Sequence, residues 1–220
     1  DGGSTDNCGI ASLDVSPNMF TCADVGANTV TLTVTDVNGN SSTCTATVTV
    51  EDNVPPVAVC MDITVQLDAS GNASIVPADV DGGSTDACGI ASLAVDMDTF
   101  DCSNVGPNNV TLTVTDVNGN TSSCVAVVTV EDNIPPLMNC PADFTVGTDP
   151  GVCGATVSFA NPLPVDNCGI ASVVQTAGLP SGSVFPVGVS VVEFTATDVN
   201  GNTTTCDFTI TVVDDEAPMA

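Results

Sequence analysis

The sequence predicts an all-β protein made of tandem, disulfide-stapled β-sandwich repeats of about 80 residues. Three observations lead to this prediction: long motifs recur along the chain, apolar and polar residues alternate within each motif, and no segment has the apolar spacing of a helix. The chain has 220 residues, of which 43% are hydrophobic, so it can form a core despite its high net charge.

Three motifs define the repeat. Cys8, Cys88 and Cys168 occupy the same place in the first motif and follow one another at intervals of 80 residues (88 − 8 and 168 − 88). The motifs and their copies are DGGSTDNCGIASL (residues 1–13, 81–93 and, shortened, 165–173), VTLTVTDVNGN (30–40, 110–120 and 192–202) and VEDNVPP (50–56, 130–136 and, weakly, 212–218). They predict a partial first repeat at residues 1–54, whose opening strands are missing, a second repeat at 55–134 and a third at 135–220.

Segments within each repeat alternate with a period of two. Residues 44–50 place Cys, Ala, Val and Val on the predicted inner face and three Thr on the outer face, and residues 206–212 place Cys, Phe, Ile and Val inward. Such alternation is typical of half-buried antiparallel strands. The Asp-Val-Asn-Gly-Asn between two such segments predicts a hairpin, because Asn-Gly readily adopts the positive φ of a tight turn.

The charge of the chain restricts its partners. It contains 27 acidic residues and no Lys, Arg or His, for a net charge of −27. Binding to nucleic acid, or to an anionic membrane surface, requires cationic side chains, so we expect neither. The neutralising charge has to come from solution, and carboxylate and amide oxygens are the ligands that calcium prefers.

Eleven cysteines without histidine indicate disulfides formed in an oxidising, extracellular setting. The spacing suggests long bridges Cys60–Cys124 and Cys140–Cys206, and short bridges within each repeat, Cys8–Cys22, Cys88–Cys102 and Cys153–Cys168. Cys44 is then unpaired, and its expected partner falls before residue 1. We therefore expect either an excerpt of a longer array or a neighbouring copy that donates the missing strand.

The segments PPVAVCMDITVQLDASG, TDACGIASL, VTLTVTDVNGN and SSCVAVVTVEDN together resemble the hyalin-repeat (HYR) family, and the third repeat is the most similar. The resemblance covers essentially the whole chain. It implies immunoglobulin-like sandwiches in long tandem arrays on cell surfaces or in extracellular matrix, used for adhesion. The first two repeats depart from the family pattern, because they carry Cys22 and Cys102 where the third carries Cys153.

Acidic and amide residues gather at the hairpins, at the junctions between repeats and in the loops before Cys88 and Cys168, where alternating oxygens suit calcium. The junction motif Glu-Asp-Asn-x-Pro-Pro is similar to the linker motif of cadherins, in which calcium stiffens the joint. For the hairpins, plain turn chemistry of Asp and Asn is an equal alternative. The predicted ligands are Asp36, Asn38, Asn40, Glu51, Asp52, Asn53, Asp81, Asp86, Asp116, Asn118, Asn120, Glu131, Asp132, Asn133, Asp166, Asp198, Asn200 and Asn202.

These features predict a structural segment of an extracellular adhesin or surface fibre, made rigid by calcium, and not an enzyme. Without His or Lys, only carboxylate pairs could act as general bases. The same acidic motifs occur in every repeat, which indicates a structural role for them and not a single active site. The alternatives are a self-polymerising filament subunit with strand exchange between copies, and a calcium-dependent carbohydrate-binding module. The chain has no Trp or Tyr for stacking on sugars. The expected partners are neighbouring repeats or copies of the chain, with cell-surface glycans or proteins as further candidates.

Overall fold

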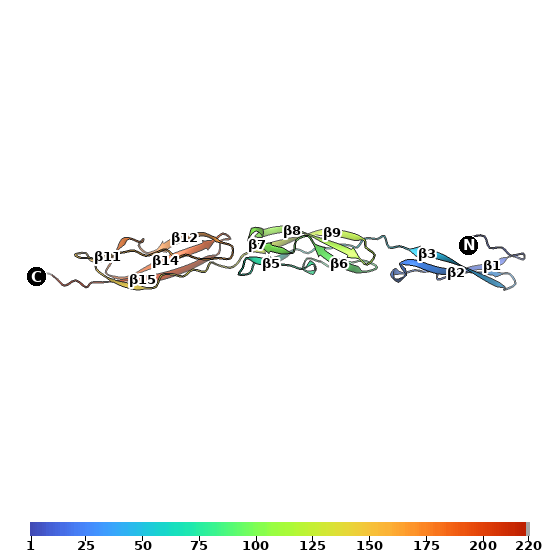
Figure 1. Cartoon of the computed structure of the whole chain (residues 1–220), viewed down its shortest axis with the longest axis horizontal. Helices are drawn as coiled ribbons and strands as arrows, with labels where there is room; N and C mark the ends of the chain where they lie inside the picture. Colours follow the sequence, from blue (N-terminus) through green and yellow to red (C-terminus); the bar gives the residue numbers. More distant parts are fainter. Residues whose placement is uncertain (219–220) are drawn as a thin grey trace. The chain divides into compact units, whose positions relative to one another are not determined.

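A computed structural model describes residues 1–218 (Figure 1). Within these residues the regular structure consists of β-strands and three single-turn 3-10 helices, which confirms the predicted all-β class. The chain divides into two compact units. The first comprises Asp1–Met61, Val80–Asp96 and Thr111–Val125, and the second Asp62–Asp79, Met97–Val110 and Ala126–Ala220. The division cuts through the middle repeat, and the repeat boundaries at residues 54 and 134 remain predictions.

Three strands recur in every repeat. They are β1 (Ile10–Ser16), β6 (Ile90–Val95) and β12 (Ile170–Ala177); β2 (Gly26–Asp36), β8 (Gly106–Asp116) and β14 (Gly188–Asp198); and β3 (Ser41–Val50), β9 (Thr121–Glu131) and β15 (Thr203–Val213). The second and third repeats add β4 (Ile63–Gln66) and β10 (Phe144–Gly147), β5 (Asn72–Ser74) and β11 (Gly154–Val157), and β7 (Thr99–Asp101) and β13 (Ser183–Pro186). The 3-10 helices are η1 (Cys22–Asp24), η2 (Pro77–Asp79) and η3 (Cys102–Asn104).

In the first unit, β1, β2 and β3 form an antiparallel sheet in that order. The β2–β3 hairpin runs in register from Gly26↔Val50 to Thr35↔Ser41, and Gly39 provides the positive φ of its turn at +89°. Strand β6 pairs with β8 as β1 pairs with β2. The predicted hairpin around Asn-Gly is therefore present.

In the second unit, the third repeat is a sandwich of two sheets. One sheet has the order β10-β15-β14-β12 with β10 parallel to β15, and the other consists of β11 and β13. The core between them is aromatic: the Phe159 ring meets the Phe208 ring edge-on at 5.2 Å, and Phe185 and Phe194 are buried beside it. Burying each such side chain stabilises the fold by about 2 kcal/mol. This arrangement confirms the immunoglobulin-like sandwich.

The predicted inward faces are buried to different degrees. In residues 206–212, Phe208, Ile210 and Val212 are buried, as the alternation predicts. In residues 44–50, Cys44 and Ala46, which the alternation places on the inner face, are exposed. The reason is that β10 pairs with β15, and β4 with β9, whereas no described strand takes that place beside β3.

Four disulfides are present among the described residues. The predicted long bridges Cys60–Cys124 and Cys140–Cys206 are confirmed. The three short bridges are wrong: Cys22 bonds to Cys88 and Cys102 bonds to Cys168, each over 66 residues. Cys8, Cys44 and Cys153 are free and exposed, so only Cys44 was predicted correctly among the unpaired cysteines.

The physical reason for the error is the extension of the chain within a repeat. The seven residues of β1 lie between Cys8 and Cys22, and a strand rises about 3.3 Å per residue, or roughly 23 Å in all. A disulfide requires Cα atoms within about 7 Å. In the observed Cys22–Cys88 bridge this distance is 5.2 Å. Cys22 and Cys102 therefore cross-link one repeat to the next and do not bond to a cysteine of their own repeat.

Within residues 1–218, no helix has the length and hydropathy needed to span a membrane.

Candidate metal centre

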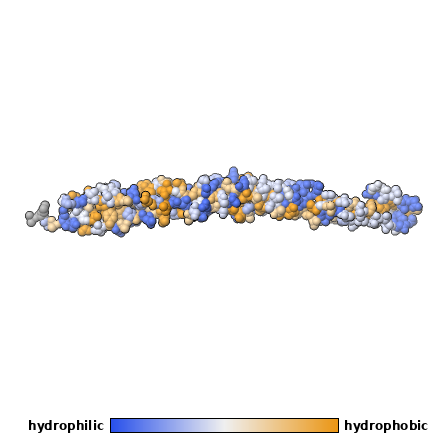
Figure 2. Space-filling model, viewed as in Figure 1, coloured by the Kyte–Doolittle hydropathy of each residue, from blue (hydrophilic) through white to orange (hydrophobic). Residues whose placement is uncertain are grey.

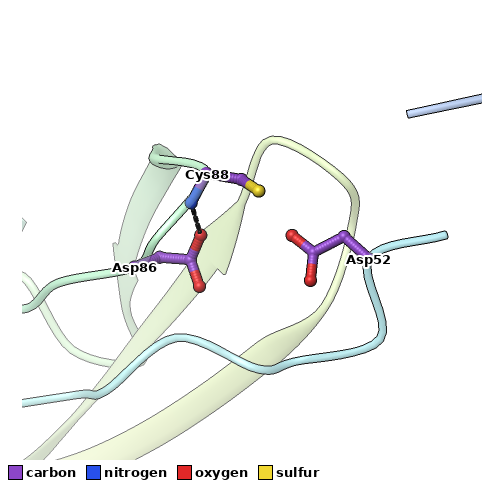
Figure 3. A group of neighbouring side chains, drawn as sticks. All are labelled: Asp52, Asp86 and Cys88. Carbon is purple, nitrogen blue, oxygen red and sulfur yellow. Dashed lines mark hydrogen bonds between the residues drawn. The ribbon is translucent and has the colours of Figure 1, made fainter. Parts of the chain in front are cut away.

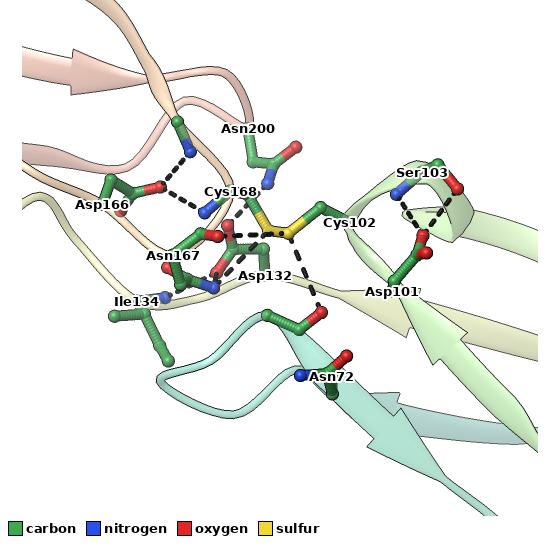
Figure 4. The surroundings of a disulfide bond; sticks show 12 residues. Asn72, Asp101, Cys102, Ser103, Asp132, Ile134, Asp166, Asn167, Cys168 and Asn200 are labelled. Carbon is green, nitrogen blue, oxygen red and sulfur yellow. Dashed lines mark hydrogen bonds between the residues drawn. A yellow bond between two sulfur atoms is a disulfide. The ribbon is translucent and has the colours of Figure 1, made fainter.

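The linker that follows β9 carries Asp132, whose side chain is only 5% exposed. Its Oδ1 accepts hydrogen bonds from Ile134 N (3.2 Å) and from Asn167 Nδ2 (3.1 Å), and its Oδ2 accepts one from Asn200 Nδ2 (2.6 Å). Asn202 Nδ2 donates to the Asp132 carbonyl oxygen at 2.9 Å. The linker acid is thus held by two loops of the third repeat (Figure 4).

The first of these loops is the Asp-Asn-Cys-Gly turn before β12. Asp166 Oδ1 accepts hydrogen bonds from the backbone N–H groups of Cys168 and Gly169, both at 2.9 Å. Asp166 Oδ2 and Asn167 Oδ1 are buried and have no hydrogen-bond partner. Two acceptor oxygens are therefore available to a cation. A buried oxygen that has no hydrogen-bond partner otherwise destabilises the folded state.

The second loop is the β14–β15 hairpin. Asp198 is 1% exposed, and its carboxylate accepts hydrogen bonds from Asn200 N, Asn202 N and Asn202 Nδ2 at 2.8–2.9 Å. Burial on its own would raise the pKa of Asp198, but the hydrogen bonds from Asn202, Asn200 and Gly201 outweigh it and lower the pKa below its usual value. Asp198 therefore carries its negative charge inside the protein.

Asp132, Asp166 and Asp198 form a cluster in which one carboxylate oxygen of each lies within 4.8 Å of the others. Two of the three are almost fully buried, and the chain has no Lys, Arg or His to neutralise them. Like charges at this distance repel strongly where water is excluded. The three donors are carboxylate oxygens, which is the chemistry of calcium sites. Asn167, whose Nδ2 donates to Asp132, has a buried Oδ1 without a partner and is a candidate for a fourth oxygen.

The first unit contains the corresponding group at the end of β3 (Figure 3). Asp52, Asp86 and Cys88 place ligand atoms within 4.8 Å of one another. Cys88 is in a disulfide, so its sulfur is not a thiolate ligand. Asp86 Oδ1 accepts from Cys88 N (2.7 Å) and Gly89 N (3.0 Å), and Asn120 Nδ2 donates to the Asp52 carbonyl oxygen at 3.0 Å.

The two groups differ in two details. Asp52 Oδ2 and Asn118 Nδ2 are buried without partners, whereas the equivalent Asp132 and Asn200 are hydrogen-bonded to each other. Ala87 occupies the position of Asn167, so the first unit lacks the amide oxygen that the second unit offers. The first group is therefore the poorer donor set.

The remaining predicted ligands lie outside both clusters found among the described residues. Asn53 donates to Glu51, and Asn133 donates to Glu131 and to Gln66, at exposed sites. Asp81 Oδ1 accepts hydrogen bonds from Ser84 N and Oγ, which cap a local turn.

The first hairpin is also a hydrogen-bonded turn. The Asp36 carboxylate accepts from Asn38 N, Asn40 N and Asn40 Nδ2, and the Asn40 side chain is the main cause that lowers the pKa of Asp36. Asp116 makes the same bonds with Asn118 and Asn120. Turn chemistry accounts for the carboxylates of both hairpins.

Sequence reasoning missed Asn167 and the position of the disulfide. The available signal for Asn167 was its place between the predicted ligand Asp166 and Cys168. The Cys102–Cys168 bridge lies beside the carboxylate cluster, and Cys102 Sγ is 3.4 Å from the Asn167 carbonyl oxygen (Figure 4). The bridge therefore holds the loop that carries Asp166 and Asn167.

Comparison with known proteins identifies the repeat. Residues 131–212 match the HYR domain. The chain is 34% identical to hyalin of Strongylocentrotus purpuratus over 216 residues, which are 94% of this chain and 18% of that protein. It is 35% identical over 115 residues to hyalin of Lytechinus variegatus, covering 51% of this chain and 22% of that protein. The chain thus spans less than a quarter of either hyalin.

Solved structures show weaker similarity. A protocadherin gamma C5 fragment (EC1-3) aligns with a TM-score of 0.37 and 12% identity, covering 87% of this chain and 79% of that one. Human protocadherin-24 EC1-2 aligns with a TM-score of 0.32 and 18% identity, covering 74% of this chain and 100% of that one. Both TM-scores are below 0.5. The sequence matches to the HYR domain and to two hyalins show that the chain belongs to the hyalin-repeat family.

Proposed function

We propose that the chain is a structural segment of an extracellular adhesion protein, in which calcium binds at the junctions between repeats and makes them rigid. The observation that carries the proposal is the cluster of Asp132, Asp166 and Asp198, together with the unpartnered oxygens of Asp166 and Asn167. A cation offsets the repulsion among these carboxylates and supplies the missing partner of both oxygens.

The ligands come from two sides of a junction. Asp132 belongs to the linker, while Asp166 and Asp198 belong to two loops of the following repeat. Pro135 and Pro136 already restrict the backbone of this linker. A cation bound to all three acids would remove further freedom, because the linker could then move only together with both loops.

The extracellular assignment rests on the disulfides, which persist in oxidising compartments. The same acidic positions recur in successive repeats, so we assign them a structural and not a catalytic role. The absence of Lys and Arg also means that the chain has no trypsin cleavage site, which suits a protein exposed to extracellular proteases.

The test compares two variants that each remove one negative charge. In Asp166→Asn the oxygen that accepts the backbone hydrogen bonds is retained and only the unpartnered Oδ2 is replaced. Asp207→Asn is the control, because Asp207 is exposed on β15 outside the cluster. Thermal unfolding and titration calorimetry are measured for the oxidised proteins with calcium, with magnesium and with a chelator.

The native chain should be stabilised by about 2.7 kcal/mol per site when free calcium exceeds the dissociation constant a hundredfold. Asp166→Asn should lose most of the stabilisation from the second-unit site, and Asp207→Asn should retain it. Equal losses in both variants would indicate general charge screening and contradict the proposed site. An equal effect of magnesium would contradict the assignment to calcium.

A further inference from the structure

The Cys102–Cys168 disulfide is attached directly to the loop that supplies oxygens to the candidate metal centre. Cys168 follows Asp166 and Asn167 in the sequence, and its backbone N–H donates to Asp166 Oδ1 at 2.9 Å. Asn167 Nδ2 lies 3.5 Å from Cys168 Sγ and donates to Asp132 Oδ1 at 3.1 Å. The disulfide and two of the candidate ligands therefore share one short loop, and a movement of one displaces the other (Figure 4).

The other end of the bridge is fixed in the 3-10 helix η3. Asp101, the residue before Cys102, accepts hydrogen bonds from Ser103 N (2.8 Å) and Ser103 Oγ (2.6 Å), and Asp101 N donates to Asn104 Oδ1 at 2.9 Å. This reciprocal capping satisfies polar groups at the start of the helix. The disulfide therefore ties the ligand loop to a well-anchored helical turn.

The ligand loop carries a charge that favours its displacement. At its start the loop is held by the antiparallel bridge between Leu137 and Val165. Beyond that bridge, Asp166 faces two further carboxylates at a distance at which like charges repel. Without a bound cation this repulsion pushes the loop away from the linker, and the disulfide limits that movement. The bond therefore keeps the ligand oxygens in place before a cation arrives, and such preorganisation raises affinity.

The sulfur of Cys102 is partly covered by backbone. It lies 3.4 Å from the Asn167 carbonyl oxygen and 3.8 Å from the Gly71 carbonyl oxygen, and a Cβ atom at Gly71 would lie 2.7 Å from it. On the face that Figure 2 shows, hydrophilic and hydrophobic groups are mixed, without a continuous apolar layer that would keep a polar thiol away. Access to the sulfur is therefore set by its immediate neighbours, and movement of the Asn167 loop uncovers it to an attacking thiol.

We propose that Cys102 and Cys168 are positioning residues for the cation site, and that the redox state of their disulfide is reciprocally coupled to occupancy of that site. This coupling rests on the proposed function, because it requires a cation held by Asp132, Asp166 and Asp198. Reduction releases the loop and weakens cation binding. By thermodynamic linkage, a bound cation makes reduction of this disulfide less favourable by the same factor, and couplings between two sites are typically roughly 5–150-fold.

Reduction consumes one molecule of a small dithiol such as dithiothreitol. One thiolate of the dithiol attacks a sulfur of the bridge, the S–S bond breaks, and the other cysteine leaves as a thiolate. The second thiolate of the dithiol then attacks its own sulfur partner in the mixed disulfide, which closes a cyclic disulfide and releases the remaining cysteine. Two protein thiols and one oxidised dithiol result, and the two protons of the dithiol pass to the two cysteines.

The other disulfides provide internal comparisons. The Cys22–Cys88 bridge holds the first-unit loop in the same way, with Cys22 Sγ 3.6 Å from the Ala87 carbonyl oxygen. That unit has the poorer donor set, so we expect its disulfide to depend less on the cation. The Cys140–Cys206 bridge packs against the apolar core of the third repeat and belongs to neither carboxylate cluster found among residues 1–218. Its reduction should not respond to the cation.

The test measures how calcium shifts the reduction equilibrium of each disulfide in the intact oxidised chain. The free thiols of Cys8, Cys44 and Cys153 are first blocked by alkylation, so that they do not exchange with the bridges. The chain is then equilibrated with graded ratios of reduced and oxidised dithiothreitol in calcium, in magnesium or with a chelator. Released cysteines are identified by isotope-labelled alkylation and mass spectrometry. Calcium should lower the equilibrium constant for reduction of Cys102–Cys168 at least about fivefold, and each tenfold change corresponds to about 30 mV.

Asp166→Asn separates the cation from the disulfide. The variant replaces the unpartnered carboxylate oxygen and keeps the oxygen that accepts the backbone hydrogen bonds of Cys168 and Gly169, so the calcium effect on Cys102–Cys168 should be lost. Asp207→Asn is the matched control and should retain the effect, because Asp207 is exposed outside the cluster. In the reverse direction, calorimetry on the Cys102→Ser/Cys168→Ser chain should show calcium affinity weakened by the same factor as the shift in reduction.

Two results would overturn the coupling and leave the proposed function in place. One is calcium that binds in calorimetry without changing the reduction of Cys102–Cys168. The other is equal protection of Cys140–Cys206, which would indicate stabilisation of the whole fold. A calcium effect that survives in Asp166→Asn would also contradict the coupling. If the double variant does not fold, the reduction equilibrium of the intact chain still decides. An oxidised chain that binds no calcium would contradict the proposed function, and the coupling with it.

Discussion

Asn200 Nδ2 donates a 2.6 Å hydrogen bond to Asp132 Oδ2, and this bond ties the last hairpin to the linker that precedes its repeat. The equivalent pair in the first unit, Asn118 and Asp52, does not form it, and both side chains keep a buried atom without a partner. The same motif therefore produces two junctions that differ in polar contacts.

This difference predicts unequal effects of two identical substitutions. Asn200→Ala removes a donor from a buried carboxylate and should lower the free energy of unfolding by about 1.5–3 kcal/mol without calcium. Asn118→Ala is the matched control and should change it by less than about 0.5 kcal/mol, because its Nδ2 makes no bond. Urea denaturation measures both, and equal losses would contradict the asymmetry.

Removal of the disulfide between repeats should be costly. Replacing Cys102 and Cys168 together by Ser opens a loop of 66 residues, which corresponds to about 4 kcal/mol of stability in the chain-entropy description. Cys153→Ser should have little effect on the monomer, since that thiol is free. Thermal unfolding provides the comparison, and a native peptide map containing Cys88–Cys102 would contradict the observed pairing.

Substitution of Gly71 and of Gly151 by Ala should distinguish two sources of destabilisation: backbone strain at positive φ and a steric clash with a neighbouring atom. Both have positive φ, +75° and +70°, but a Cβ at Gly71 would lie 2.7 Å from Cys102 Sγ, whereas nothing lies within 4 Å at Gly151. Gly151→Ala should cost about 1–2 kcal/mol, from the backbone conformation alone. Gly71→Ala should cost clearly more in chemical denaturation, and an equal cost would show that the turn moves freely away from the disulfide.

Adding an amide oxygen should improve the first junction. Ala87→Asn gives the first unit the side chain that Asn167 provides in the second. We expect the weaker of two calcium sites to become several-fold tighter in titration calorimetry, while Asn167→Ala should weaken the tighter site. If neither substitution changes any affinity, the amide oxygen is not a ligand.

The stability of the fold should decrease in acid. Hydrogen bonds lower the pKa of Asp36, Asp101 and Asp198 in the folded chain, so their stabilisation is present above the unfolded pKa of about 3.9 and is lost as pH falls through the lower folded values.

The unfolding free energy in the absence of calcium should therefore change little between pH 7 and 5 and fall below about pH 4. Urea denaturation from pH 2 to 7 measures this curve. Asp198→Asn is the control: it does not titrate, and its acid limb should be shallower. An equally steep loss of stability in Asp198→Asn would show that the hydrogen bonds to Asp198 do not contribute to the pH dependence.

Much of the candidate site could be predicted from residue types, and part of it could not. The sequence alone places Asp132 at a junction, Asp166 in a loop and Asp198 in a hairpin, and each has counterparts in other repeats. Carboxylate oxygens in such a pattern already indicate a site for a hard cation. The sequence could not separate them from Glu131 and Asp81, which are equally acidic and lie outside the cluster. Only the folded chain shows which carboxylates face one another, because residues 132, 166 and 198 are distant along the sequence.

The strands and the hairpins can be predicted from the sequence alone, because alternation and turn formation depend on residues a few positions apart, and the family can be recognised from the repeated motifs. The structure decided which cysteines are joined and which inner faces are covered. Cys22 lies closer to Cys8 than to Cys88 along the chain, but an extended strand carries it away from Cys8 and the next repeat brings Cys88 to a Cα distance of 5.2 Å. Proximity in a β-protein depends on the direction of its strands, and sequence separation does not report that direction.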